Sequence, residues 1–226
     1  MLCAFYLRGG SSSRQRGAYA GKRTDQILPP GMAGFRDANL YPLKGPDIAT
    51  AKKWADKAGI KSGTGVELYT SNRGSAPLVA QIIQFNLKQI GLDVNSHLFA
   101  RAVQIDKEGT RGEPFDITTE GWIADYADPY DFNNVLLYGV NLHASNNNNV
   151  AYFNDPKYNK AMTSAANLSG SARYKAYGHL DVAMMKDNPP WAARTNFNDR
   201  VLLSGRVGCF TFNATYSVDL AALCIK

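Results

Sequence analysis

Three aspartates at intervals of three residues are the side chains in this sequence best placed to do chemistry. The stretch from 121 to 131 contains Asp125, Asp128 and Asp131, together with Trp122, Tyr126 and Tyr130. Two carboxylates can perform acid–base hydrolysis, as in glycosidases, but the sequence does not fix the geometry that this requires. A calcium loop is disfavoured because the ligand spacing and terminal glutamate of an EF-hand are missing. A carboxylate that meets a ligand cation beside an indole face is the third kind of site.

Local structure offers a simpler role for two of these carboxylates. Aspartates just before a helix commonly accept hydrogen bonds from its first N–H groups. We therefore interpret Asp128 and Asp131 as caps of the next helix.

The segments around this loop alternate between strand and helix. The sequence predicts helices at 47–58, 75–90 and 102–107 and strands at 66–70, 92–98 and 115–119. Strands interleaved with helices indicate βαβ units and an open, mostly parallel sheet, so the predicted fold class is α/β. The aspartate loop follows the third strand, at the sheet edge where ligands bind in such folds.

The remainder of the chain is less regular at both ends. Residues 9–25 lack apolar periodicity and are expected to form a disordered leader. An Asn-rich run at 146–149 is expected to be a surface loop, helices are predicted at 155–168 and 171–186, and the tail from 192 to 225 is expected to be extended.

Composition and charge exclude several classes of function. Of the net charge of +6, +4 falls in residues 1–26, so the other 200 residues present no basic face for a nucleic acid. No Walker-type phosphate loop is present, and no apolar run reaches the roughly 18 residues of a membrane span. The apolar start at 1–7 lacks the features of an export signal. The histidines and cysteines fit no zinc spacing, so we expect neither a metal nor a cofactor.

Two late cysteines leave two readings open. Cys209 and Cys224 lie 15 residues apart and can close a loop, which would contribute roughly 3 kcal/mol in the chain-entropy model. Two buried free thiols are about equally compatible with the sequence.

The aspartate loop carries a resemblance to a known family. Residues 121–129, Gly-Trp-Ile-Ala-Asp-Tyr-Ala-Asp-Pro, resemble the motif of the family 5 extracellular solute-binding proteins, the peptide- and nickel-binding receptors of ABC importers. Further agreements in type and order are the turn at 28–35, the helix at 47–58, the helix-to-strand junction at 90–94, Phe115-Asp116, and Asn-Asp-Pro at 154–156. The resemblance covers residues 27–226.

The resemblance implies a role for each residue of the motif. Such receptors close two α/β lobes of a periplasmic-binding-protein-like fold over a peptide, and their loop backbone pairs with the ligand as an added strand. Carried over, Gly121 and Ile123 offer backbone hydrogen bonds, Trp122 walls the pocket beside Tyr126, and Asp125 holds the α-ammonium group of the peptide. For Asp125, ligand binding thus outweighs a purely structural role.

The same resemblance implies a division of the chain. Residues 1–26 resemble nothing in the family, 27–204 resemble the C-terminal lobe only, and 205–226 resemble the segment that returns to pack on an N-terminal lobe. We therefore expect a truncated receptor whose partners are a peptide, the permease subunits and the missing lobe. Family members are extracellular or periplasmic, often as lipoproteins, and are not enzymes. The alternatives are a non-functional remnant of such a receptor and a small hydrolase that uses Asp125 and Asp128.

Overall fold

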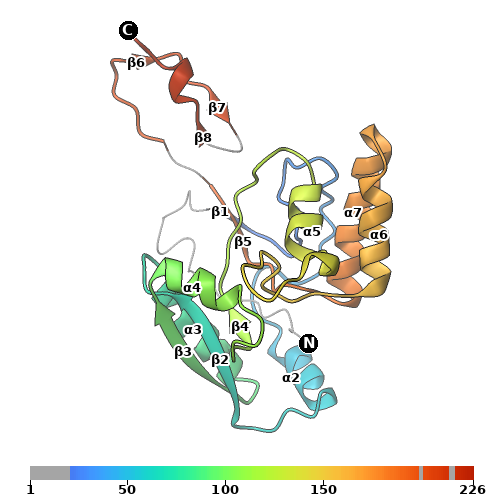
Figure 1. The fold of residues 1–226 in the computed structure, drawn as a ribbon. Coiled ribbons are helices and arrows are strands. Elements are labelled where there is room, and N and C mark those ends of the chain that lie inside the picture. Colours follow the sequence, from blue (N-terminus) through green and yellow to red (C-terminus); the bar gives the residue numbers. More distant parts are fainter. Residues whose placement is uncertain (1–20, 199–200, 214–216) are drawn as a thin grey trace.

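The computed structural model describes residues 21–198, 201–213 and 217–226 (Figure 1). Its elements up to the aspartate loop are β1 (Gly21–Arg23), α2 (Ile48–Lys57), β2 (Thr64–Ser71), α3 (Ala76–Lys88), β3 (Leu92–Phe99), α4 (Arg101–Glu108) and β4 (Ile117–Thr118). After the loop come α5 (Tyr130–Leu137), η2 (Gly139–Asn141), α6 (Pro156–Ala166), α7 (Gly170–Asp187), β5 (Thr195–Phe197), β6 (Val207–Gly208), β7 (Phe212–Asn213), β8 (Ser217–Val218), η3 (Leu220–Ala222) and β9 (Cys224–Ile225). The alternation of strands and helices confirms the predicted α/β class.

A three-stranded parallel sheet in the order β3-β2-β4 positions the aspartate loop. Strand residues alternate between its two faces. Val66 and Leu92 form a core cluster with Leu87 of α3 on one face. Tyr69 and Phe99 point to the other face, where Lys107 of α4 lies over both rings. Helices α3 and α4 therefore cover opposite faces of the sheet, and the aspartate loop begins where β4 ends between them.

A second core lies among the three helices that follow the loop. Helices α5, α6 and α7 bury a cluster that includes Leu137, Met162 and Met184, and Ile27 and Leu28 from the start of the fold join it. The proline- and glycine-rich turn after Leu28 crosses α7 closely, because a Cβ atom at Gly178 would stand 2.1 Å from the carbonyl oxygen of Gly34. That crossing explains the glycine at each position.

The start of the folded unit differs from the expected leader. Residues 1–20 lie outside the described residues, but β1 pairs antiparallel with β5, and Thr24, Asp25 and Gln26 are buried. The expectation of an irregular leader is therefore wrong for residues 21–26. The reason is a partner far along the chain: the Asp181 carboxylate of α7 accepts hydrogen bonds from the backbone N–H of Ile27 at 3.0 Å and from the Gln26 side chain at 3.2 Å.

The buried Asp181 makes stability depend on pH. Burial raises the pKa of this carboxyl from 3.8 to about 6, against the lowering effect of its hydrogen bonds. Between pH 4 and 6 the folded state thus binds more protons than the unfolded chain, and stability falls as pH rises. Between pH 4 and pH 6, the free energy of unfolding of the unmodified protein should fall by roughly 3 kcal/mol relative to that of Asp181→Asn. Urea denaturation of the two proteins at pH 4 and pH 7 measures this change, and Asp56→Asn is the control for the loss of one exposed carboxylate. Parallel pH profiles of stability for the unmodified protein and Asp181→Asn would contradict the prediction.

The Asn-rich run is more buried than expected. Asn147 and Asn149 are both buried, and their side-chain amides donate to backbone carbonyls, that of Asn147 to Gly109 at 2.8 Å. The run is therefore not a simple surface loop, because two of its amides replace backbone pairing inside the fold.

The C-terminal arm, residues 201–213 and 217–226, stands away from the two cores (Figure 1). It contains the β6–β9 and β7–β8 pairs, and a disulfide joins Cys209 to Cys224. Phe212 and Leu220 are 57% and 77% exposed. Trp54 is 43% exposed on α2, with Lys57 over its ring.

Candidate functional site

The aspartate loop leaves β4 as an extended segment. Gly121, Ile123, Asp125 and Tyr126 are exposed along it, whereas Trp122 is half-buried against the core of α5–α7. Because alternate residues of an extended chain point to opposite sides, Trp122 anchors the segment while its neighbours face outward. The sequence-predicted site residues thus lie along one continuous segment at the carboxyl end of the sheet.

Asp131 fastens this segment from the other end of the loop. Its buried Oδ2 accepts from the Trp122 Nε1–H and from the Asp125 backbone N–H, each at 3.0 Å. The residue lies inside α5, and the N-cap position belongs to Pro129. The interpretation of Asp131 as a helix cap is therefore wrong: the carboxylate holds the loop to the helix instead.

Asp128 does contact the start of α5, but it also makes a second attachment. Its Oδ1 accepts from the Tyr130 N–H at 2.8 Å, and its two oxygens receive Nε and Nη2 of Arg173 at 2.9 and 2.8 Å. Partial burial acts to raise the pKa of this carboxyl, but Arg173 and the Tyr130 N–H outweigh it and hold the pKa below its ordinary value. Asp128 is thus tied into an ion pair, which leaves it poorly suited to the hydrolytic pairing with Asp125.

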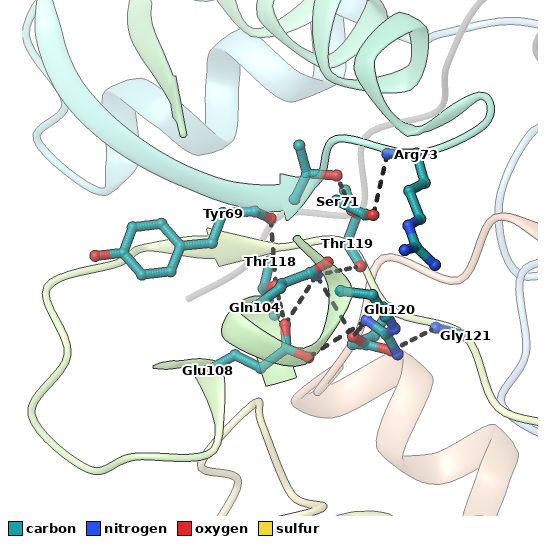
Figure 2. Close-up of polar contacts among 11 residues, drawn as sticks. Tyr69, Ser71, Arg73, Gln104, Glu108, Thr118, Thr119, Glu120 and Gly121 are labelled. Carbon is teal, nitrogen blue, oxygen red and sulfur yellow. Dashed lines mark hydrogen bonds and ion pairs between the residues drawn. The ribbon is translucent and has the colours of Figure 1, made fainter. Parts of the chain in front are cut away.

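A cluster of charged residues at the beginning of the segment was not anticipated from the sequence (Figure 2). Glu120 accepts two hydrogen bonds from the Arg101 guanidinium, with Arg101 Nη2 to Oε2 at 2.8 Å, and also accepts from the Gly121 N–H at 3.0 Å. Glu108 of α4 lies behind them, with its Oε1 3.7 Å from Arg101. No motif in the sequence joins the members of this cluster, because they come from α4 and from the residue two positions after β4.

One cation beside the segment has no ion-pair partner among the described residues. Arg73 follows the carboxyl end of β2 and is exposed. In Figure 2 its side chain runs from that strand end toward Glu120 and Gly121. Its position after a predicted strand was the signal that could have identified it.

The segment offers a ligand both charge and free backbone groups. Within the described parts of the chain, neither the backbone of Ile123 nor the carboxylate of Asp125 has a hydrogen-bond partner, whereas the Gly121 N–H is engaged by Glu120. The described residues contain no group of three or more potential metal ligands. None of the described helices is long and apolar enough to span a membrane. The arrangement can pair with an extended chain and hold a cation; it does not assemble a pair of free carboxylates.

Comparisons with known proteins point to one family. The model for "Bacterial extracellular solute-binding proteins, family 5 Middle" matches residues 17–144. A probable D,D-dipeptide-binding periplasmic protein of Escherichia coli K12 is 31% identical over 114 residues, which are 50% of this chain and 21% of that protein. A di/tripeptide-binding protein of Pseudomonas aeruginosa UCBPP-PA14 is 34% identical over 110 residues, 46% of this chain and 20% of its own.

Solved structures show the same fold over nearly the whole chain. The clavulanic acid biosynthesis oligopeptide binding protein 2 superposes with a TM-score of 0.80 at 20% identity, over 95% of this chain and 41% of its own. A dipeptide binding protein from Pseudoalteromonas sp. SM9913 in complex with Met-Leu superposes with a TM-score of 0.75 at 22% identity, over 96% and 43%. The matches thus span about a fifth of the curated relatives and about two fifths of these structures.

Proposed function

Because the chain belongs to the family 5 bacterial extracellular solute-binding proteins, we propose that it is the peptide-binding lobe of a receptor that serves an ABC importer. Membership confirms the resemblance first seen in the motif at 121–129. Homologues are peptide-binding periplasmic components of such importers and are substrate-binding proteins rather than enzymes, which agrees with the prediction of no catalysis.

The free carboxylate of Asp125 beside the free backbone of Ile123 is the observation that carries this proposal. An extended peptide that pairs with Ile123 gains main-chain hydrogen bonds whatever its side chains are. Its α-ammonium group then meets Asp125, and Trp122, fixed by Asp131, forms the adjacent wall. Charge-assisted hydrogen bonds of this kind are about twice as strong as neutral ones, so the peptide's amino end gives the orientation.

Arg73 supplies the complementary charge for a short ligand. Its side chain runs toward Glu120 and Gly121 (Figure 2), and Asp125 follows four residues after Gly121, at the other end of the segment. A free dipeptide or tripeptide carries an ammonium group and a carboxylate at its two ends, which match Asp125 and Arg73 respectively. Guanidinium groups bind carboxylates in a bidentate manner, so the proposed ligand is a short peptide with both termini free.

We also propose a division of the chain, which the partial length of the matches supports. Residues 27–204, extended to residue 21 by β1, form the C-terminal lobe, and 205–226 form the segment that packs on a second lobe. The exposed Phe212 and Leu220 support that packing. The permease subunits are the further partners, and an extracellular or periplasmic location follows for the whole receptor.

Thermal shifts with three forms of one peptide test the function. Free Ala-Phe should stabilise the chain by about 1.4 kcal/mol at ten times its Kd. N-acetyl-Ala-Phe lacks the ammonium group that Asp125 would bind, and Ala-Phe-amide lacks the carboxylate that Arg73 would bind. Both peptides should therefore shift the thermal unfolding transition much less than free Ala-Phe does. Equal shifts from all three forms would contradict recognition of the termini. No shift from any form at millimolar concentration would instead indicate a non-functional remnant.

A further inference from the structure

The attachment of Gly121 to Glu120 bears on how the segment receives a ligand. Among the motif residues, Gly121 has its N–H engaged by an adjacent side chain rather than left free. A ligand carbonyl that is to reach this N–H must displace a charged carboxylate, and hydrogen bonds to charged groups are stronger than those to neutral carbonyls. At Ile123 no such competition exists among the described residues.

Arg101 fixes the carboxylate in that position. Its guanidinium donates to both oxygens of Glu120, and the same Oε2 that receives Arg101 Nη2 also receives the Gly121 N–H (Figure 2). A forked pair of this kind is geometrically specific. Because Arg101 begins α4 and Glu120 follows β4, the pair joins the ligand segment to the helix that covers the sheet.

We propose that Glu120 is a positioning residue of the ligand segment: held by Arg101, it occupies the Gly121 N–H and makes peptide pairing begin at Ile123. The proposal rests on the peptide-binding function proposed above and adds a determinant of where along the segment the ligand starts. The Arg101–Glu120 pair also makes the site respond to pH, because Glu108 lies next to it.

Glu108 is the buried carboxyl group whose ionisation would cause this pH response. Its side chain is 2% exposed, against 23% for Glu120, and its Oε2 accepts from Gln104 Nε2 at 3.0 Å and from the Thr118 hydroxyl. Burial, reinforced by Glu120, raises the pKa of Glu108 to about 8. Burial acts to raise the pKa of Glu120, but its hydrogen bonds with Arg101, Glu108 and the Gly121 N–H outweigh burial and hold that pKa below its ordinary value.

Ionisation of Glu108 therefore disturbs the pair. The ionisable groups around it are Arg101 on α4, Glu120 after β4, and Tyr152, whose hydroxyl donates to the Glu108 carbonyl. Above about pH 8, two carboxylates face one guanidinium, and Glu120, the more exposed of the two, is the one that can move into water. The Gly121 N–H is then released.

Amide hydrogen exchange of the 226-residue chain, followed by NMR, tests this without a ligand. In the unmodified protein, the Gly121 amide should be protected at pH 7 relative to that of Ile123 and should lose protection with a midpoint near pH 8. Glu120→Ala should accelerate Gly121 exchange at pH 7 about tenfold or more, because a hydrogen bond to a charged group is lost. An unprotected Gly121 amide in the unmodified protein would overturn the proposal even if no variant folds.

Two further variants separate positioning from general destabilisation. Glu113→Ala removes another carboxylate of 23% exposure from a salt bridge, with Lys107, and should leave Gly121 exchange unchanged. Glu108→Gln should keep the protection at pH 7 and abolish its loss at pH 9. Equal acceleration in Glu113→Ala and Glu120→Ala, or an unaltered pH profile in Glu108→Gln, would contradict the proposal. Failure of every peptide to bind would refute the proposed function, whereas these exchange results would stand.

Discussion

Replacing Asp125 by Asn is expected to weaken binding of a free dipeptide by about tenfold to a hundredfold. The Asp125 carboxylate has no partner among the described residues, so its charge is available to the ligand's ammonium group. Asn keeps the shape and one acceptor oxygen but removes the charge. The Asp125 backbone N–H still reaches Asp131, so the loop should keep its conformation. Titration calorimetry of the two proteins measures the change in Kd.

The chemistry of the ligand provides the control for this prediction. N-acetyl-Ala-Phe has no ammonium group, so Asp125→Asn should leave its weak affinity unaltered, and the two changes together should cost no more than either alone. Asp106→Asn, which removes an exposed carboxylate on α4, should bind like the unmodified protein. A loss that is as large for the acetylated peptide as for the free one would show that Asp125 acts on the loop and not on the amine.

Asp131→Ala is expected to destabilise the protein by about 2 to 4 kcal/mol and to abolish measurable peptide binding. The substitution leaves the Trp122 indole N–H and the Asp125 backbone N–H without their acceptor. Trp122, which anchors the loop, and the exposed Asp125 therefore lose their shared acceptor together. Urea denaturation measures the stability, and the indole N–H resonance of Trp122 in an NMR spectrum reports the local change.

A graded pair of variants distinguishes this anchor from ordinary burial. Asp131→Asn keeps one oxygen in place and should recover most of the binding, since a single oxygen of Asp131 accepts both hydrogen bonds. Asp128→Asn disturbs the Arg173 ion pair in the same loop and should leave the Trp122 indole resonance in place. An Asp131→Ala protein with normal peptide affinity would rule out the anchoring role.

Local chemistry predicted the elements around the site well. Asp47 caps α2 by accepting from the Thr50 N–H, and Asp155 caps α6 in the same way from the N–H groups of Lys157 and Tyr158. Gly91 follows α3 with a φ of +92°, as expected of a glycine that ends a helix. In each of these cases the residue that decides the structure is adjacent in sequence to the structure it decides. The parallel sheet followed from the alternation of such elements.

The parts that the sequence did not predict are those held by distant partners. Asp131 was expected to cap the helix but lies inside α5, where its carboxylate anchors the loop because Trp122 and Asp125 turn back toward it. Residues 21–26 look irregular in isolation and are ordered by α7 and β5. The Arg101–Glu120 pair joins residues 19 apart that belong to no common motif. The motif allowed a role for Asp125 to be predicted. The side chains that hold the loop around Asp125 could not be predicted from it.

The pairing of β1 with β5 has a consequence for the order in which the chain folds. The β2–α3–β3 unit spans fewer than 40 residues, so its contacts can form early. The hydrogen bond from Ile27 to Asp181 joins residues 154 positions apart and should form later. Closing so long a loop is slow relative to local structure. The fold should therefore assemble in two kinetic stages, with the sheet first and the closure by β1 and α7 last. The ligand segment, which lies between them, becomes rigid only when both are complete.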